Sequence, residues 1–549
     1  MIRRMTVLLL AAAAMVPGAS VVSQAQPQQL MTRHTRDAVV NGQAQSLGRL
    51  PASQSLQFDV VLPLRHEPEL ESFLEQVYDP SSSSYRQFVT VKEFTERFGP
   101  SQEDYDAVIR FAGANGLKVV GGSRDAMDVQ LKGPVAAIEK AFHVTMGLYQ
   151  HPTENRTFFA PDREPSADLP FQLWHISGLD NYSIPHPMLQ HNEKQLGVRP
   201  NVKGSCPGGT YCGSDMRAAY YGGTSLTGAG QTVGLLEYVG YDIADEKTYF
   251  TNVKQANKVP VKGVSTDGTS LSCLVSKGCD DREQILDIVQ AVSMAPGLKT
   301  LYVFVGSSDT AILGSMTKHS PLSAQVSSSW TWEPSDPKTD DPFFQKFAAQ
   351  GQNYFQAAGD SGAYNSGSSY VFPGNDAYVT SVGGTDLQTA SAGGAWASET
   401  AWVDGGGAYY TVDSIPIPAW QKLTGVITAK NKGSKTIRNS PDVSAEANFD
   451  FYSCADQSPC QTGWGGTSFA APMWAGYMAL VNQQAVANGK PLLGFINPLI
   501  YPLGLSKGYA AAFHDIIKGS NGFPAVKGYD LATGWGSPNG AGLINALAP

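Results

Sequence analysis

The stretch GWGGTSFAAPMWAG, residues 463–476, contains a serine whose surroundings suit a nucleophile. Ser468 follows a glycine-rich bend, which exposes its hydroxyl, and precedes a run of small residues that predicts a helix. The first N–H groups of a helix are free to bind an anion. A serine nucleophile also needs a base to take its proton, and histidine is the usual base.

The histidines of this chain are poorly placed for that role. Seven of the nine precede residue 200, and only His319 and His514 follow it. His319 lies in the polar stretch TKHSPLS, and His514 lies near the C-terminus, where we expect a structural role. Neither has glycine-rich surroundings, so the sequence indicates that the base of Ser468 is another kind of group.

Two carboxylates on one predicted helix are better candidates. In CDDREQILDIVQAVSMAPG, residues 279–297, Glu283 and Asp287 are four positions apart, so both project from one helix face, about 6 Å apart. Apolar residues beside them require a packed helix, and desolvation and like-charge repulsion then favour a shared proton. Such a pair can act as a base at acid pH. Spacing alone favours the alternative of a solvated acidic face, and Asp280 is expected to cap the helix.

A third acid, Asp360, follows an apolar run in AAGDSGA, residues 357–363. Asp360 could simply be a turn residue, but active sites gather at the carboxyl ends of parallel strands. The Gly-Asp-Ser-Gly string would make Ser361 a trypsin-like nucleophile. We reject that interpretation because the chain lacks a histidine-bearing partner motif and a double β-barrel pattern.

Four apolar runs predict the sheet that would hold these groups: TVGLLEY, TLYVFVG, SAQVSSSW and NYFQAAGDSG. Helical segments separate these runs along the chain. Apolar runs without alternation are typical of parallel strands that are buried on both faces. Residues 215–549 therefore predict a doubly wound α/β domain.

The first part of the chain has a different pattern. Between residues 50 and 180, strand patterns such as LQFDVVLPL and MDVQLKG alternate with helix patterns such as SQEDYDAVIRFAGANG, which opens on a capping serine. This order predicts a small ferredoxin-like α+β domain. Residues 181–214 contain several prolines and glycines, which indicates a linker.

Length and composition limit the class of protein. A chain of 549 residues is too long for one ordinary domain, and its net charge of −9 gives no reason to propose nucleic acid as a partner. Residues 1–25 combine a basic start with an apolar run, which predicts a signal peptide. No other stretch has the ~18 continuous apolar residues of a membrane span. We therefore expect a secreted, extracellular protein without a membrane partner.

The six cysteines fit an exported protein. They form three local pairs, each with five residues between its members: Cys206 and Cys212, Cys273 and Cys279, Cys454 and Cys460. The repeated spacing favours disulfides within each pair, although the sequence alone leaves other pairings open. A metal site is disfavoured because no histidine lies near any pair along the chain.

These motifs, in this order, resemble the sedolisin family of serine-carboxyl peptidases. The match includes GGTSFAAPMWAG, the helix with Glu283 and Asp287, and AAGDSGA. It extends to SSSW (327–330), FPGNDAYVTSVGGT (372–385), GGGAYYTVDSIPIPAWQ (405–421), RNSPDVSA (438–445) and TGWGSPNG (533–540). Residues 26–180 resemble the activation prodomain of that family, most clearly in DPSSSSYRQFVTVKEFTERFGPS, residues 79–101.

The resemblance implies a subtilisin-like catalytic domain, residues 215–549, in which a carboxylate replaces histidine. Ser468 would be the nucleophile, Glu283 its general base, and Asp287 the group that shares and orients the proton of Glu283. Asp360 would lie at the oxyanion hole with the N–H of Ser468. Two further residues resemble the hydrogen-bond network behind the base: Glu237 and Trp330.

The resemblance also implies one structural calcium ion near the C-terminus. The stretch FHDIIKGSNGFPAVKGYDLATGWG has two acids in a glycine-rich loop, which suits the flexible oxygen coordination of calcium. The implied ligands are the side chains of Asp515 and Asp530 and the carbonyls of Ile516, Val526 and Gly528.

The sequence therefore predicts a secreted, acid-active serine-carboxyl endopeptidase that is made as a proenzyme. The prodomain would be an intramolecular inhibitor, and self-cleavage within residues 181–214 would release a monomeric enzyme that acts on protein or peptide substrates. Two alternatives remain open: a tripeptidyl exopeptidase of the same family, and a non-catalytic secreted binding protein that kept the fold.

Overall fold

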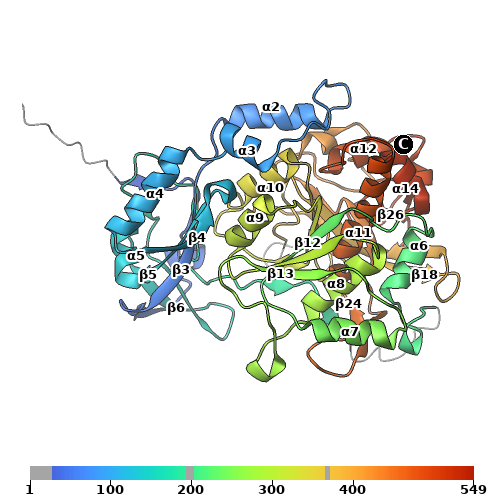
Figure 1. Cartoon of the computed structure of the whole chain (residues 1–549), viewed down its shortest axis with the longest axis horizontal. Coiled ribbons are helices and arrows are strands. Elements are labelled where there is room, and N and C mark those ends of the chain that lie inside the picture. The colour runs from blue at the N-terminus through green and yellow to red at the C-terminus, as the bar shows by residue number, and fades with distance from the viewer. Residues whose placement is uncertain (1–26, 193–202, 365–370) are drawn as a thin grey trace, which may run out of the picture.

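A computed structural model describes residues 27–192, 203–364 and 371–549 (Figure 1). It contains a smaller N-terminal domain, drawn in blue and cyan, and a larger domain that contains the main sheet. The predicted signal peptide, residues 1–25, lies outside the described residues. Among the helices of the described part, none is long and apolar enough to cross a membrane.

The N-terminal domain is built on a four-stranded antiparallel sheet. Its strands, in spatial order, are β4 (Lys118–Ser123), β5 (Asp128–Pro134), β3 (Ser55–Val61) and β9 (His175–Ser177). Helices α4 (Gln102–Ala114) and α5 (Val135–Phe142) pack on this sheet, and Ser101 caps α4 by accepting a hydrogen bond from the Asp104 N–H. In chain order the strands lie 2-3-1-4 across the sheet, which confirms the ferredoxin-like prediction.

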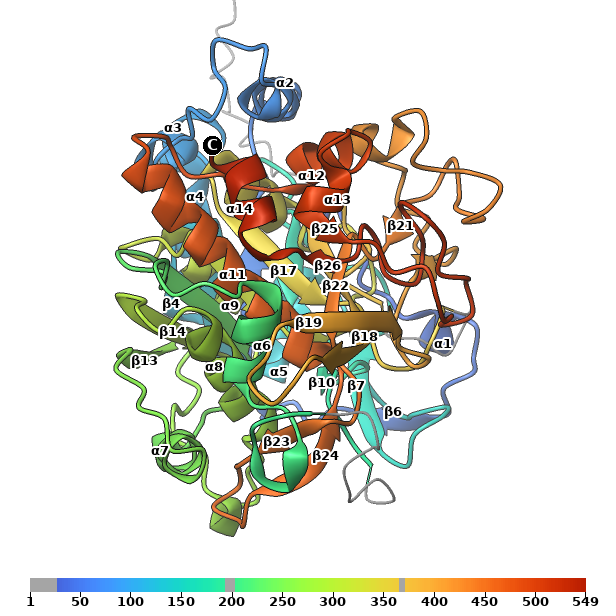
Figure 2. The ribbon, with the colours of Figure 1, turned by 90° about the vertical axis from the view of Figure 1, so that its right-hand side faces the viewer.

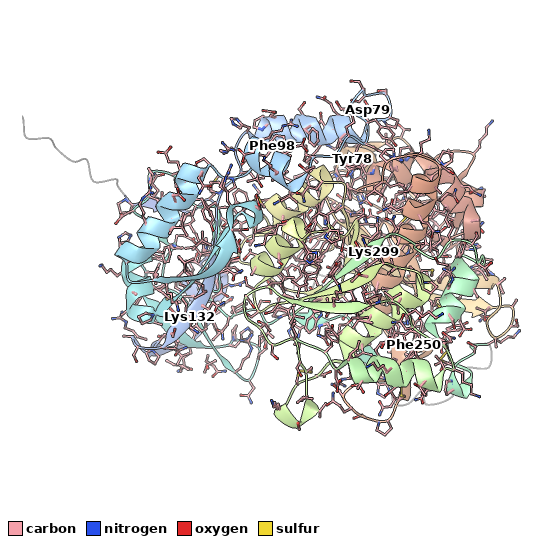
Figure 3. The ribbon with its side chains drawn as sticks, in the orientation of Figure 1. Tyr78, Asp79, Phe98, Lys132, Phe250 and Lys299 are labelled. Carbon is pink, nitrogen blue, oxygen red and sulfur yellow. A yellow bond between two sulfur atoms is a disulfide. The ribbon has the colours of Figure 1, made fainter. Side chains whose placement is uncertain are left out.

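A helical arm of the N-terminal domain reaches over the larger domain. It comprises α2 (Glu67–Tyr78) and α3 (Val91–Arg97), and α2 lies across α10 (Asp341–Ala349) at the top of Figure 1. Tyr78, labelled in Figure 3, donates a hydrogen bond to the Ala348 carbonyl at 2.7 Å and accepts one from the Phe495 N–H at 2.8 Å. Apolar side chains of both domains form one continuous buried cluster there, so the two domains share part of their core.

The larger domain contains the predicted doubly wound sheet. Its strands run β13 (Val261–Ser265), β14 (Thr300–Val305), β12 (Thr232–Glu237), β15 (Gln325–Ser328), β17 (Asn353–Ala357), β18 (Thr380–Thr389) and β19 (Trp396–Ala401), with β22 (Val443–Glu446) also paired to β18. All pairings are parallel except that of β19. The four apolar runs are β12, β14, β15 and β17, so the fold-class prediction is confirmed.

Helices cover both faces of this sheet. The buried helices α8 (Arg282–Met294) and α11 (Thr467–Ala487) pack against each other on one face, and α9 (Asp309–Lys318) lies with α10 on the other (Figures 1 and 2). Leu235 belongs to the core under α8 and α11, whereas its neighbour Leu236 belongs to the core under α9 and α10. Successive side chains of a strand point to opposite faces, which explains why these strands are apolar throughout.

Three local disulfides join the cysteine pairs favoured by their spacing: Cys206–Cys212, Cys273–Cys279 and Cys454–Cys460. The first closes a short loop at the end of the linker, and the other two close short loops of the larger domain. The prediction of local pairing is confirmed.

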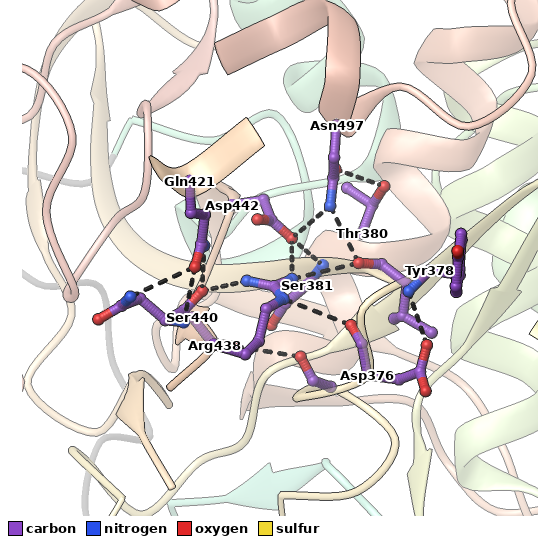
Figure 4. A network of polar contacts seen from close by, with 12 residues as sticks. Asp376, Tyr378, Thr380, Ser381, Gln421, Arg438, Ser440, Asp442 and Asn497 are labelled. Carbon is purple, nitrogen blue, oxygen red and sulfur yellow. Dashed lines mark hydrogen bonds and ion pairs between the residues drawn. The ribbon is translucent and has the colours of Figure 1, made fainter. Parts of the chain in front are cut away.

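The RNSPDVSA motif contributes a buried ion pair to the sheet (Figure 4). Arg438 contacts Asp442 at 2.6 Å, and both side chains are fully buried. The Asp442 carboxylate also accepts hydrogen bonds from the Ser381 N–H, the Asn497 amide and the Tyr501 hydroxyl, at 2.8, 3.1 and 2.7 Å. A buried charge is tolerated when such partners satisfy it, so this network ties β18 and β22 to α12 (Asn497–Gly504).

We predict that Arg438→Ala lowers the free energy of unfolding by about 3–5 kcal/mol, because it leaves the Asp442 charge buried without its partner. Denaturant unfolding in a Ser468→Ala background measures this without self-cleavage. Arg49→Ala is the matched control, because Arg49 pairs with Glu139 while its own side chain is 67% exposed. Equal losses in the two variants would contradict the role given to the buried pair.

Candidate active site

The two helix carboxylates lie inside the molecule. Glu283 and Asp287 are both buried on the inner side of α8, against α11, so the solvated-face alternative is wrong. Asp281, not Asp280, is the residue that precedes the first turn. The Asp280 side chain pairs with the Arg282 guanidinium and also accepts a hydrogen bond from the Arg282 N–H at 3.1 Å, so Asp280 caps the helix from one position before Asp281.

Ser468 lies in the first turn of α11, after the left-handed backbone of Gly466, and it is fully buried. Its hydroxyl is near the Glu283 carboxyl and lowers the pKa of that group, but burial and the neighbouring Asp287 act more strongly and raise it well above its ordinary value. Burial likewise raises the pKa of Asp287. The helices therefore hold the three expected groups together in an environment that favours protonated carboxyls.

Two hydrogen bonds reach the carboxyl groups behind the pair. Trp330 donates from its indole N–H to Glu237 at 2.7 Å, and Glu237 interacts with Asp287. Ser329, which sequence reasoning missed, donates from its hydroxyl to Asp287 at 2.8 Å. Ser329 belongs to the SSSW string quoted for the resemblance, but only the tertiary contact of this segment with Asp287 of α8 shows its role.

Asp360 stands at the carboxyl end of β17, close to the first turn of α11. Its Oδ1 atom accepts hydrogen bonds from the N–H and the hydroxyl of Thr467, both at 2.8 Å. Its Oδ2 atom is buried and has no hydrogen-bond partner among the described residues. Burial raises the pKa of Asp360 to about 7, against the lowering effect of the Thr467 bonds. Asp360 is therefore a buried acid with one oxygen aimed into the site, rather than a turn residue.

Residues 186–191 of the linker pass through the site as an extended chain. Within it, β10 (His186–Pro187) pairs with β16 (Trp330–Thr331), and β11 (Gln190–His191) pairs with β24 (Gln461–Gly465), both antiparallel. The Met188 carbonyl between them accepts a hydrogen bond from the Ser468 N–H at 3.2 Å and another from the Ser468 hydroxyl. Residues 186–191 therefore occupy the position that a peptide substrate would need.

Gly466 permits this close approach. A Cβ atom at Gly466 would lie 2.6 Å from Asp360 Oδ2 and still closer to the Met188 oxygen. The Asp360 carboxyl and the Met188 carbonyl thus meet beside one backbone position that has no side chain. The glycine-rich bend therefore admits these two oxygens beside Ser468, but it does not expose the serine as the sequence predicts, because Ser468 is fully buried with the linker in place.

One histidine approaches the cleft, from the linker, and another has a structural position elsewhere in the larger domain. His191 stacks on Trp464 with 4.2 Å between ring centroids, and its Nε2 atom lies 3.0 Å from the Thr462 carbonyl. His514 stacks on Trp396 at 3.9 Å, which fits the structural role expected for it. The Ser468 hydroxyl donates its hydrogen bond to the backbone carbonyl of Met188, and no histidine is its partner among the described residues.

The five residues expected around calcium meet in one loop cluster near the C-terminus. The Gly528 N–H donates to Asp515 at 3.1 Å, and the Val526 N–H donates to Asp530 at 2.7 Å. The carbonyls of Ile516, Val526 and Gly528 accept no backbone hydrogen bond from the described residues. In the described part of the chain, no three acidic, histidine or cysteine side chains gather in a metal-binding group. Two carboxylates with three free carbonyls still fit the oxygen preference of calcium.

The fold and the site together define the class of protein. A parallel sheet with a serine at the start of its central helix, closed by an N-terminal domain whose linker fills the cleft, defines a serine-type peptidase in proenzyme form. Residues 42–182 match the family described as "Pro-kumamolisin, activation domain", and residues 240–492 match the subtilase family.

Similar proteins then identify the family. Kumamolisin of Bacillus sp. (strain MN-32) is 31% identical over 92% of this chain and 94% of its own length. Sedolisin of Pseudomonas sp. (strain 101) is 26% identical over 91% of this chain and 88% of its own length. A solved structure of Pseudomonas sedolisin, complexed with pseudo-iodotyrostatin, aligns with a TM-score of 0.52 and 25% identity over 61% of this chain and 97% of its own. The chain belongs to the sedolisin family of serine-carboxyl peptidases.

The raised pKa of Asp360 predicts how stability depends on pH. Because burial moves this pKa from 3.8 to about 7, Asp360 contributes its full stabilisation below about pH 4, and the contribution is lost as the pH rises through 7. We expect the melting temperature of the Ser468→Ala proenzyme to fall between about pH 4 and pH 8. Adding Asp360→Asn should make that fall smaller, and identical falls in both proteins would contradict the assignment.

Proposed function

We propose that this protein is an acid-active endopeptidase in which Ser468 is the nucleophile and Glu283 its general base. The observation that carries the proposal is the linker in the cleft, whose Met188 carbonyl lies against the Ser468 hydroxyl and N–H. Asp287 shares a proton with Glu283, and Ser329 and Glu237 hold Asp287 in place.

The reaction follows from these contacts. Glu283 takes the proton of Ser468 as the serine oxygen attacks the substrate carbonyl, and it then gives that proton to the leaving amine. Water, activated by the same carboxylate, hydrolyses the resulting ester. The oxyanion is bound by the Ser468 N–H and by Asp360, which can donate a hydrogen bond only in its protonated form.

This requirement sets the direction of the pH dependence. Asp360, with its pKa near 7, is protonated in acid and loses its donor proton towards neutrality. Removal of the linker would let water reach Glu283, which would lower the pKa of Glu283 and provide the free carboxylate that the base needs. Activity should therefore be highest in acid and decline as the pH rises through 7.

An endopeptidase is favoured over a tripeptidyl exopeptidase because the chain continues through the cleft in both directions. On one side of Met188 it runs back through β10 into the N-terminal domain, and on the other it pairs with β24 as far as Asn192. A site that requires a free N-terminus three residues from the scissile bond would not accommodate this path. A non-catalytic binding protein would need neither the buried carboxyl pair nor the oxygen of Asp360 aimed at the cleft.

The test is an acid assay of purified protein with a long unlabelled peptide. We expect internal cuts and little activity above pH 7, with activity reduced by about 10³-fold or more in Ser468→Ala and Glu283→Gln. Ser361→Ala is the matched control and should keep wild-type activity. Stepwise release of tripeptides would favour the exopeptidase, and full activity of Glu283→Gln would contradict the assignment of Glu283 as the general base.

We also propose that residues 1–25 direct secretion, which N-terminal sequencing of protein recovered from the culture medium would check.

We further propose that the protein binds one structural calcium ion through the side chains of Asp515 and Asp530 and the carbonyls of Ile516, Val526 and Gly528. Bound calcium would join the segments around these residues and stabilise the C-terminal loops. It takes no part in peptide hydrolysis.

Chelation should therefore lower the melting temperature of the Ser468→Ala protein, and added calcium should restore it. In Asp515→Asn, which keeps the size of the side chain but removes its charge, the calcium-dependent shift should be much smaller. Asp162→Asn, in the N-terminal domain, should shift as the parent protein does. A melting temperature unaffected by chelation would remove the calcium proposal.

A further inference from the structure

The linker is held in one register against Ser468, and this register singles out one peptide bond. The Met188 N–H donates to the Ser329 carbonyl at 2.8 Å, while the Met188 carbonyl accepts from the Ser468 N–H at 3.2 Å. We propose that Met188–Leu189 is the first bond this protein cuts in its own chain, and that Met188 identifies an apolar residue as the preferred one on the acyl side. This inference rests on the proposed function of Ser468.

The residues on either side of this bond are held by contacts with other groups. Pro187 pairs with Trp330 on one wall of the cleft, and Gln190 pairs with Gly465 on the other. The Gln190 side-chain amide donates to the Asp360 carbonyl at 2.7 Å. A slip by one residue would break both antiparallel pairings and reverse the faces of the side chains, so the two walls fix Met188 as the residue whose carbonyl faces the serine.

The surroundings of Met188 are apolar. Its side chain is 8% exposed and belongs to the core cluster of the larger domain, and Leu189 packs against the same cluster. A charged side chain in the place of Met188 would have to be desolvated without a partner, which is costly. Farther along, His191 stacks on Trp464, so an aromatic or imidazole ring is favoured three residues after the cut.

The cleavage itself balances without any further reactant. The Ser468 oxygen bonds to the Met188 carbonyl carbon, the bond to the Leu189 nitrogen breaks, and Glu283 carries the serine proton to that nitrogen. Water then hydrolyses the ester and regenerates the serine. The products are a chain that ends at Met188 and a chain that begins at Leu189.

The experiment is a time course of the acidified proenzyme, followed by intact mass and N-terminal sequencing. The first new N-terminus should be Leu189, and Met188→Lys, which stays charged in acid, should slow its appearance about tenfold or more. Ile184→Lys is the matched control, since Ile184 lies in the same linker but is 43% exposed, and it should be cut at the wild-type rate. If both variants are cut at the wild-type rate, the apolar site for Met188 is refuted.

The outcomes separate this inference from the proposed function. A first cut elsewhere in the linker that does not occur in Ser468→Ala would overturn the assignment of the Met188–Leu189 bond. It would still support Ser468 as the nucleophile. An unchanged cut in Ser468→Ala would overturn both. The peptide IPHPMLQHN, residues 184–192, provides a test that does not depend on folding of the variants: mature enzyme should cut it between Met and Leu, and a cut at any other bond would contradict the register.

Discussion

The burial of carboxyl groups between α8 and α11 is the constraint on which the rest of this structure depends. Both helices are buried along nearly their whole length, so their contact excludes water from Glu283 and Asp287. Ionised carboxylates in such a place are costly, and a shared proton relieves the cost. The same exclusion raises the pKa of Asp360 at the other side of Ser468. The packing of this helix pair is therefore also the cause of the raised pKa values of Glu283 and Asp287.

Under the proposed function, one segment of the linker would both block the cleft and contain the peptide bond whose cleavage begins activation. It completes a strand on each wall of the cleft, which blocks the cleft to other peptides while presenting a carbonyl to the serine. The N-terminal domain strengthens this arrangement, because its arm shares a core with α10 and anchors Tyr78 between Ala348 and Phe495. Cutting the linker alone would leave these contacts in place, so release of the domain is a separate event from cleavage.

The quoted motifs divide into those that do chemistry and those that support it. GGTSFAAPMWAG and AAGDSGA bring the serine and Asp360 together, whereas RNSPDVSA builds the Arg438–Asp442 ion pair at the start of β22 (Figure 4). The ion pair joins the start of β22 to the start of β18, and just beyond the other end of β22 the Ala447 carbonyl accepts a hydrogen bond from the Gly466 N–H in the bend that precedes Ser468. A family motif can thus support the scaffold of the site without containing a group that touches substrate.

The sequence by itself determined the class of fold and the candidate groups of the site, because apolar runs, helix spacing and short motifs are local properties of the chain. It could not distinguish a buried carboxyl pair from a solvated helix face, since the burial of Glu283 depends on α11, nearly two hundred residues away. Nor could it find Ser329, or the linker register at Met188. Those depend on which surfaces meet when two domains and two distant helices pack, and only the tertiary structure decides that.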